Sequence, residues 1–427
     1  MNYQESRAYI ENATQKFGSV LGLDNMRELM KRLGNPQDDL QFVHVAGTNG
    51  KGSAITYLYS TLVNAGYHVG RYISPTIYSY RERMEVQGQK ITKEKFASYL
   101  TQVAAVIDQM VCEGLPHPTP FEIETAIAFL FFKDEQCELV LLEVGMGGNL
   151  DATNIIHNTK LAVLVPISKD HMSFLGNTLG EIAEKKAGII KKGCLVATVK
   201  QTPEVMEAIC RKCEEEGVQV VVADKEQAQI LEESCMGQTF SYKKEVFDIS
   251  LAGVYQKENA ALALECLGIL DKLGYPTTLE QKKEGLKKAA WGGRFTVIHK
   301  EPLFVVDGAH NPAAADMLAD SIEHYFKGKR LIYIMGVFRD KDYESVIRKT
   351  VHYADKILTI QTPDNPRALP AEELAQAVGR FHSDVKPMAS LDAAVKEAFA
   401  LAGRDDVILA FGSLSFIGDM TRIVDGE

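Results

Sequence analysis

Short apolar runs alternate with stretches of helical periodicity along most of the chain. The apolar runs are rich in Val, Ile and Leu, which is typical of parallel strands buried on both faces. Between them, apolar residues recur at the spacing of amphipathic helices. We therefore predict an α/β fold built on parallel sheets. The strands predicted in the first part of the chain are 42–46, 67–73, 139–144, 161–167, 195–199 and 218–222.

Helices and a hairpin are predicted around these strands. Gly88 marks the turn of a hairpin within 86–91. Residues 223–252 look irregular, with a short β segment at 240–249, and a strongly helical run follows from about residue 256. The other predicted helices are two within 3–33, joined near 17–19, and single helices at 54–65, 92–112, 120–132, 178–190 and 204–216.

A second α/β pattern starts after Trp291–Phe295. Strands are predicted at 303–306, 331–335, 356–360 and 407–411, with helices at 312–326, 343–353, 371–380 and 391–402. Strands that alternate with helices indicate a parallel, doubly wound sheet. We predict two domains, a larger parallel-sheet domain at 1–295 and a smaller Rossmann-like α/β domain at 296–427.

A glycine-rich loop follows the first strand and precedes a helix. Its glycines let the backbone N–H groups approach an anion, and the helix start adds partial positive charge. Lys51 supplies a charge for phosphates, and the Ser53 hydroxyl can bind Mg²⁺. The spacing departs from the common P-loop, so an ordinary glycine-rich turn is the alternative. The loop reads Gly47-Thr48-Asn49-Gly50-Lys51-Gly52-Ser53.

Polar residues follow several other predicted strands, where α/β proteins bind ligands. Glu143 ends an apolar strand before a glycine loop, as expected of a Mg²⁺ ligand, and a structural ion pair is the alternative. Ser74 begins a polar loop that contains Arg83; this loop is either a metal and carboxylate site or simply solvated. His171 is either a further ligand or a structural histidine.

The start of the helix at 120–132 has two interpretations. Thr119, with proline next and Glu122 three residues later, is typical of a capping box. The second interpretation, a role of these residues and Phe121 towards a ligand, comes only from a family resemblance and is compatible with the capping box.

Composition narrows the class of protein. The 427 residues carry a net charge of −10, which argues against a general nucleic-acid binder. We found no apolar run long enough to span a bilayer and no signal-peptide character at the start. Seven scattered cysteines favour free thiols in a reducing cytoplasm, and Cys210 and Cys213 are interpreted as incidental. We expect a cytoplasmic monomer without nucleic-acid or membrane partners.

Several motifs resemble, in order, those of the folylpolyglutamate synthase and dihydrofolate synthase family of the Mur ligase superfamily. They are the glycine loop, Ser74-Pro75, Thr119-Pro120-Phe121-Glu122, Leu150-Asp151-Ala152-Thr153-Asn154, Asp170-His171, Lys186-Ala187-Gly188-Ile189, Gln256 with Asn259, Gly293-Arg294-Phe295 and Asp307-Gly308-Ala309-His310-Asn311-Pro312. The resemblance implies a Mur ligase-like fold, a P-loop domain followed by the Rossmann-like domain. It also implies a ligase that uses ATP and Mg²⁺ to add L-glutamate to a reduced folate, or to dihydropteroate.

The resemblance also implies roles for individual residues. Lys51, His171 and Lys186 would be catalytic, and in related ligases the equivalent of Lys186 can be carbamylated. The remaining implied residues bind the nucleotide (Gly47, Thr48, Asn49, Gly50, Lys51, Gly52, Ser53, Asn259, Arg294, Asp307 and His310), the metal (Ser53, Ser74, Glu143 and His171) or the substrate (Arg83, Phe121, Glu122 and Asp151).

The chain departs from the family pattern at four positions. Thr76 and Ile77 replace His-Leu, Asn149 replaces an arginine, and Gly292 replaces a proline. Two alternatives stay open from the sequence, an ATP-hydrolysing regulatory protein and a Mur-type cell-wall ligase. Composition and spacing alone predict only a two-domain α/β protein that binds a nucleoside triphosphate and Mg²⁺.

Overall fold

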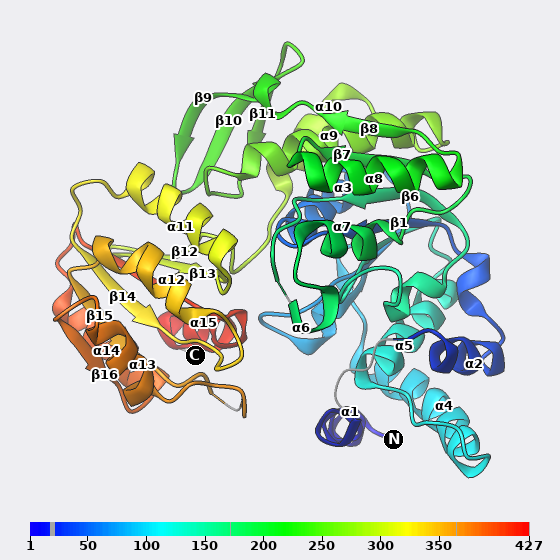
Figure 1. Ribbon diagram of the computed structural model, residues 1–427, viewed down its shortest axis with the longest axis horizontal. Coiled ribbons are helices and arrows are strands. Elements are labelled where there is room, and N and C mark those ends of the chain that lie inside the picture. Colours follow the sequence, from blue (N-terminus) through cyan, green and yellow to red (C-terminus); the bar gives the residue numbers. More distant parts are fainter. Residues whose placement is uncertain (18–21, 171, 364, 427) are drawn as a thin grey trace. The chain divides into compact units, whose positions relative to one another are not determined.

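The computed structural model describes the whole chain except residues 18–21, 171, 364 and 427 (Figure 1). The described chain divides into two compact units, each made of several segments. The sequence places one boundary at residue 295, whereas two earlier segments, 75–80 and 227–257, belong to the second unit. The first unit contains 1–74, 81–226 and 258–286, and the second contains 75–80, 227–257 and 287–427.

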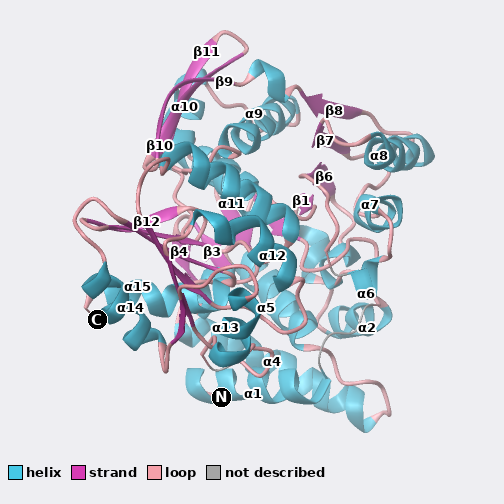
Figure 2. Cartoon of the chain, turned by 60° about the vertical axis from the view of Figure 1, so that its left-hand side comes forward, coloured by secondary structure: helices cyan, strands magenta, loops and turns pink. Residues whose placement is uncertain are grey.

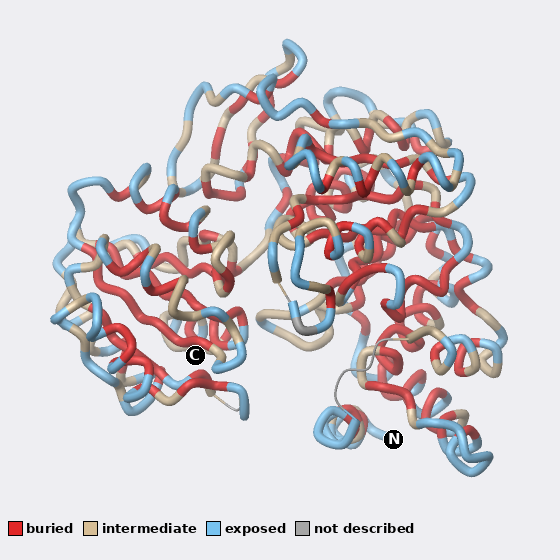
Figure 3. Tube along the Cα trace, viewed as in Figure 1, coloured by how far each residue is buried: buried red, intermediate tan, exposed pale blue. Residues whose placement is uncertain are grey.

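The first unit is built on an eight-stranded sheet in the order β4-β3-β2-β5-β1-β6-β7-β8. The strands from β2 to β8 pair in parallel, and β3 and β4 add an antiparallel hairpin at one edge. The central strands β1 and β5 are buried along their whole length (Figure 3). The strands are β1 (Phe42–Ala46), β2 (Val69–Tyr72), β3 (Met84–Val86), β4 (Gln89–Lys90), β5 (Leu139–Glu143), β6 (Thr159–Leu164), β7 (Leu195–Val199) and β8 (Val220–Ala223).

Helices cover this sheet and position its loops. Apolar residues of α7 and α8 pack with those of β6 and β7 in one core cluster. Elsewhere, α1 packs against α4 and α5. The helices of this unit are α1 (Tyr3–Phe17), α2 (Asp24–Arg32), α3 (Lys51–Asn64), α4 (Lys93–Cys112), α5 (Pro120–Asp134), α6 (Met172–Leu175), α7 (Leu179–Ala187), α8 (Pro203–Glu216), α9 (Gln256–Lys272) and α10 (Leu279–Lys288), with short 3₁₀ turns η1 (Pro36–Asp39), η2 (Tyr80–Arg83), η3 (Ala152–Ile155) and η4 (Lys225–Gln227).

The second unit contains a six-stranded sheet in the order β12-β13-β17-β14-β15-β16, parallel except for β12. Alternate strand residues face two separate core clusters, one shared with α11, α12 and α13 and the other with α14 and α15. Figure 2 labels these five helices. This is the predicted doubly wound sheet. Its elements are β12 (Thr296–Lys300), β13 (Leu303–Asp307), α11 (Pro312–Tyr325), β14 (Leu331–Met335), α12 (Tyr343–Thr350), η5 (Val351–Tyr353), β15 (Lys356–Thr359), α13 (Ala371–Gly379), β16 (Val385–Pro387), α14 (Leu391–Leu401), β17 (Val407–Phe411), η6 (Leu414–Phe416) and α15 (Ile417–Asp425).

A separate three-stranded antiparallel sheet occupies most of the stretch that was predicted to be irregular. It consists of β9 (Gln229–Ser234), β10 (Gly237–Tyr242) and β11 (Glu245–Ile249). The prediction included only the later strands. It missed β9 because most residues of that strand are exposed and it lacks a buried apolar face.

Most other predicted elements are present, with ends that shift by a few residues. The capping box at Thr119 is confirmed, because its hydroxyl accepts from the Glu122 N–H and the Glu122 carboxylate accepts from the Thr119 N–H. The joint of the first two helices lies partly outside the described residues. None of the described helices is long and apolar enough to cross a membrane.

Candidate active site

The glycine loop between β1 and α3 has a shape that only glycine permits at two positions. At Gly47 φ is 145°, and a Cβ atom would lie 2.2 Å from the Val165 side chain. At Gly50 φ is 98°, and a Cβ atom would lie 2.6 Å from Oδ1 of Asn259. Gly50 is also the N-cap of α3 and offers no side-chain acceptor to the N–H groups of the first helical turn. These N–H groups therefore suit an anion, and the structure brings Asn259 beside them.

Two lysines and one carboxylate converge on this loop. Nζ of Lys186 donates to the Gly47 carbonyl at 2.8 Å, and Nζ of Lys51 lies 3.4 Å from the same oxygen. Oε1 of Glu143 is 3.8 Å from Nζ of Lys51. Because 17% of the Lys51 side chain is exposed, its ammonium group can reach a bound phosphate.

Lys186 has an unusual protonation equilibrium. Burial lowers the pKa of its ammonium group to about 7, and the charge of Lys51 acts in the same direction. Asp170 and Asp151 oppose this shift. Near neutral pH, much of Lys186 is therefore a neutral amine, the form that carbamylation requires.

The predicted metal ligands supply oxygen atoms at the ends of two strands and at the start of α3. Glu143 is buried at the end of β5, and its Oε2 accepts from the Ser74 backbone N–H at 3.0 Å. Ser53 is buried in the first turn of α3. His171 lies outside the described residues, and among those described no group of three or more His, Cys, Asp or Glu is placed to hold a metal. One carboxylate with serine hydroxyls is a ligand set that suits Mg²⁺, because this ion usually has phosphate oxygens and water molecules at its remaining coordination positions.

Asp151 is held rigidly inside its own loop, which follows β5. Its Oδ1 accepts from the Thr153 N–H at 3.0 Å and from the Thr153 hydroxyl at 2.5 Å. Its Oδ2 accepts from the Met146 N–H at 2.7 Å. Burial raises the pKa of Asp151, and these donors act against that shift by stabilising the anion. The carboxylate therefore fixes the loop that it belongs to.

Phe121 lies against the same loop. A Cβ atom on Gly145 would be 2.5 Å from the Phe121 ring, so the ring rests directly on the glycine backbone. The structure thus brings together two predicted substrate residues, Phe121 and Asp151, that come from different elements.

Two other predicted substrate residues are engaged within the protein. Glu122 is buried, and burial raises its pKa in spite of hydrogen bonds from Thr119 and from Asn25 and Met26 of α2. It therefore joins the starts of α5 and α2. Arg83 forms a 3.0 Å ion pair with Glu124, and both side chains are largely buried.

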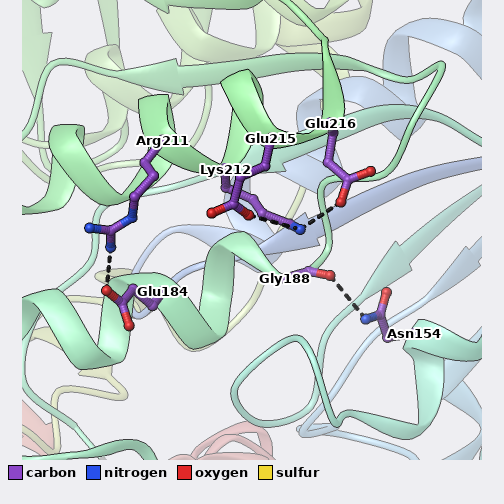
Figure 4. Close-up of polar contacts among 7 residues, drawn as sticks. All are labelled: Asn154, Glu184, Gly188, Arg211, Lys212, Glu215 and Glu216. Carbon is purple, nitrogen blue, oxygen red and sulfur yellow. Dashed lines mark hydrogen bonds and ion pairs between the residues drawn. The ribbon is translucent and has the colours of Figure 1, made fainter.

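Asn149, where the family has arginine, borders a polar surface pocket of about 350 Å³ between α7 and α8. Nearby, Nδ2 of Asn154 donates to the carbonyl of Gly188 at 3.1 Å (Figure 4). The cations of this pocket are paired with acids: Arg211 with Glu184, and Lys212 with Glu215 and Glu216. The pocket is thus close to charge balance, and Arg211 is directed to Glu184 rather than to a free anion.

In the second unit, the predicted residues gather at the end of β13. Asp307 is buried and accepts from the N–H groups of Phe295 and Ala309, each at 2.7 Å. Burial raises the pKa of Asp307, and the nearby Arg294 acts against this. His310 Nδ1 lies 2.7 Å from the Gly308 carbonyl. Arg294, Asp307 and His310 therefore lie around one turn.

Two departures from the family pattern have packing partners in this unit. Ile77 packs against the core cluster shared with α14 and α15. A Cβ atom on Gly292 would lie 2.5 Å from the Tyr78 ring, so the absence of a side chain there lets the two segments meet.

Two residues that stabilise the Asp151 loop were missed by the sequence analysis. His44 is fully buried in β1 and contacts Thr153, and Nζ of Lys191 donates to the carbonyls of Asn154, at 2.8 Å, and Ile156. The one available signal was a histidine inside an otherwise apolar strand.

Family models match most of the chain. The Mur ligase middle domain matches residues 45–267, and the Mur ligase glutamate ligase domain matches 293–414. A dihydrofolate synthase/folylpolyglutamate synthase of Bacillus subtilis is 34% identical over 438 aligned positions that cover 98% of each chain. The folylpolyglutamate synthase of Lacticaseibacillus casei is 31% identical and covers 87% of this chain and 88% of its own.

Solved structures agree with these relatives. The E. coli FolC structure in complex with DHPP and ADP has a TM-score of 0.86 and 29% identity, covering 100% of this chain and 98% of the other. A Mycobacterium tuberculosis folylpolyglutamate synthase complexed with ADP and AMPPCP has a TM-score of 0.88 and 28% identity, covering 100% and 99%.

Proposed function

Because the chain belongs to the folylpolyglutamate synthase and dihydrofolate synthase branch of the Mur ligase family, it is an ATP-dependent ligase that joins glutamate to a folate, and we propose that the site described above carries this reaction. The observation that supports the proposal best is the convergence of Lys51, Lys186 and Glu143 on the glycine loop. Relatives named for folate ligation favour this activity over a regulatory ATPase or a cell-wall ligase.

In the proposed reaction, a folate carboxylate attacks the γ-phosphorus of ATP, the bond to the bridging oxygen breaks, ADP leaves, and an acyl phosphate forms. The amine of L-glutamate then attacks the acyl carbon, and phosphate leaves as the amide forms. Lys51 and the N–H groups at the start of α3 stabilise the charge of the transferring phosphoryl group. Lys186, as a carbamate, would place an anion beside the loop.

We propose that Ser53, Ser74, Glu143 and His171 hold Mg²⁺. The ion would neutralise phosphate charge during transfer. The carboxylate of Glu143 supports this assignment, because it is buried at the end of β5 beside Lys51 of the glycine loop. Glu143→Gln should raise the Mg²⁺ concentration needed for turnover, and an unchanged requirement would argue against the site.

The remaining predicted residues divide between the two units. In the first, Asn259 beside the glycine loop is proposed to bind the nucleotide, and Phe121 with the Asp151 loop is proposed to face the pterin ring. In the second, Arg294, Asp307 and His310 are proposed to bind the nucleotide. The direct substrate roles of Arg83 and Glu122 have less support, because both side chains have partners within the protein.

ADP release tests the proposed function. The protein is mixed with Mg-ATP and L-glutamate, and tetrahydrofolate, dihydropteroate or neither is added. We propose a cytoplasmic monomer that responds to a pterin substrate, and the responding pterin tells whether it has one activity or two. ADP release that ignores both pterins and glutamate would contradict the ligase, and light scattering would test the monomer.

A further inference from the structure

His44 occupies an unusual place for a polar side chain. It lies in the middle of β1, between Leu142 of β5 and Ala162 of β6, and is fully buried. Its Nε2 lies 2.9 Å from Oγ1 of Thr153, which is 109 residues away in the sequence. Its Nδ1 is buried and has no hydrogen-bond partner among the described residues. A buried polar group is costly, so this arrangement calls for a role.

The direction of each hydrogen bond follows from the Asp151 carboxylate. Its Oδ1 accepts from the Thr153 N–H, and the Thr153 hydroxyl lies 2.5 Å from the same oxygen, so that hydroxyl donates to Oδ1. The hydroxyl oxygen is left as an acceptor, and His44 must then donate from Nε2–H. Burial, with the charge of Lys191, lowers the pKa of His44 well below its usual value, so the ring is neutral and carries this one proton.

The series of hydrogen bonds from His44 through Thr153 and Asp151 ends at Met146, next to the glycine that the Phe121 ring contacts. Oδ2 of Asp151 accepts from the Met146 N–H at 2.7 Å, and Gly145, directly before it, lies under the Phe121 ring. Loss of a hydrogen bond that fixes Asp151 would therefore make the loop next to the Phe121 ring less ordered. None of these hydrogen bonds is made by a residue of the glycine loop, 47–53.

We propose that His44 is a positioning residue for the pterin substrate, acting through its Nε2–H and the Thr153 hydroxyl to fix the Asp151 loop. The inference rests on the proposed function, because it assigns the Phe121 and Asp151 surface to the pterin. The substrate group concerned is the bicyclic pterin ring of a folate or pteroate. We expect a change at His44 to weaken binding of this ring and to leave ATP binding unchanged.

Replacing His44 with glutamine tests whether the Nε2–H of His44 is the group that positions the Asp151 loop. The NH₂ of glutamine can occupy the place of Nε2–H, whereas asparagine is shorter and matches Nδ1. His44→Gln should therefore keep the donor, and His44→Leu, of similar volume, should remove it. Thr153→Ser keeps the hydroxyl, and Thr153→Val removes it with little change in shape.

Steady-state kinetics on the purified full chain test the proposal. We expect His44→Leu to raise KM for the pterin substrate about threefold to tenfold, and Thr153→Val about tenfold, as the loss of one buried hydrogen bond implies. KM for ATP should stay within about twofold, and Thr153→Ser and His44→Gln should restore the pterin KM.

Three results would overturn the proposal: a pterin KM for His44→Leu that equals wild type, equal increases for His44→Leu and His44→Gln, or parallel increases in KM for ATP and pterin. If His44→Leu does not fold, the comparison of Thr153→Val with Thr153→Ser decides alone. A wild-type protein that releases ADP without any pterin would refute the proposed function instead, before a variant is made.

Discussion

The glycine loop after β1 and the Asp151 loop after β5 follow neighbouring strands of one sheet, yet they are held in different ways. The glycine loop depends on residues that lack side chains at Gly47 and Gly50, where a Cβ atom would collide with Val165 or Asn259. The Asp151 loop depends on side-chain hydrogen bonds, among them one to Thr153 from His44, 109 residues away.

This difference has a functional meaning. A loop that binds phosphate presents backbone N–H groups, so glycines must let its backbone approach the anion, while the Thr48 hydroxyl and Lys186 support the loop with hydrogen bonds. A loop that faces an organic ring must instead hold side chains at fixed positions, and this requires a network of satisfied polar groups. Under the proposed assignments, the two loops can therefore fail separately, one losing the nucleotide and the other losing the pterin.

Lys51→Ala should have the largest effect. It removes the charged side chain of the glycine loop, which we propose to face the phosphates, and we expect turnover to fall by about a thousandfold or more. The fold should survive, because the contacts of Nζ are long, at 3.4 and 3.8 Å. Ligase turnover and thermal unfolding check this, with the exposed Lys396→Ala as control. Near-wild-type turnover would refute the phosphate-loop assignment.

Lys186→Met tests the buried lysine beside the glycine loop. Burial lowers the pKa of Lys186 from 10.5 to about 7. Between these values the unfolded chain binds a proton that the folded chain does not, so this residue makes the folded state more stable as pH rises. Burying Lys186 lowers the free energy of unfolding by its full amount below pH 7, and this destabilisation disappears above about pH 10.5.

At about pH 7, Lys186→Met should therefore have a higher free energy of unfolding than wild type, by a few kcal/mol at most. This difference in unfolding free energy should disappear towards about pH 10. Urea unfolding at both pH values measures it, with Lys185→Met, a less buried lysine of the same helix, as control. A gap that does not change with pH, together with a mass increase on the Lys186 peptide, would show that a carbamate replaces the free amine.

Gly50→Ala tests whether the glycine loop depends on its backbone. The new Cβ atom would meet Oδ1 of Asn259 at 2.6 Å and would also be strained at φ 98°. Gly88→Ala is the matched control, because its φ is 75° and nothing lies within 4 Å. We expect the control to lose about 1 kcal/mol of unfolding free energy and Gly50→Ala about 2–3 kcal/mol. Only Gly50→Ala should raise KM for ATP, and equal behaviour of the two variants would contradict the special role of Gly50.

The sequence predicted the glycine loop in detail because its rules are local. Strand, glycines, lysine and helix follow one another directly, and the start of α3 was misplaced by three residues. Most strands and helices after residue 295 were predicted for the same reason, because each has a buried apolar pattern of its own. The sequence analysis missed α15 and the strands β12 and β16, and neither of these strands has such a pattern.

The parts that could not be predicted depend on distant contacts. The strand β9 is largely exposed, and residues 75–80 join the second unit although their neighbours belong to the first. The partners of Thr153 and Asn154 lie on other elements, so spacing along the chain gave no hint of them. Asp151 was found only through the resemblance, and His44 was not found at all.

Asn154→Ala should have the smallest effect and is the sharpest test of the contrast between the loops. Nδ2 of Asn154 donates to the carbonyls of Asn149 at 3.2 Å and Gly188 at 3.1 Å, and the residue is buried. Two carbonyls would lose their donor, which should cost about 1–2 kcal/mol of unfolding free energy. Asn158→Ala removes a similar but exposed bond to the Asp38 carbonyl and should cost about 0.5 kcal/mol.

Urea unfolding of both asparagine variants, with KM for the pterin and for ATP, makes the comparison. Asn154→Ala should raise the pterin KM slightly and leave the ATP KM unchanged, because the glycine loop shares none of these bonds. If Asn154→Ala costs no more than Asn158→Ala, side chains do not determine the shape of the Asp151 loop. The two loops would then be held in the same way, by their backbones, and the separate failure of pterin and nucleotide binding would lose its physical basis.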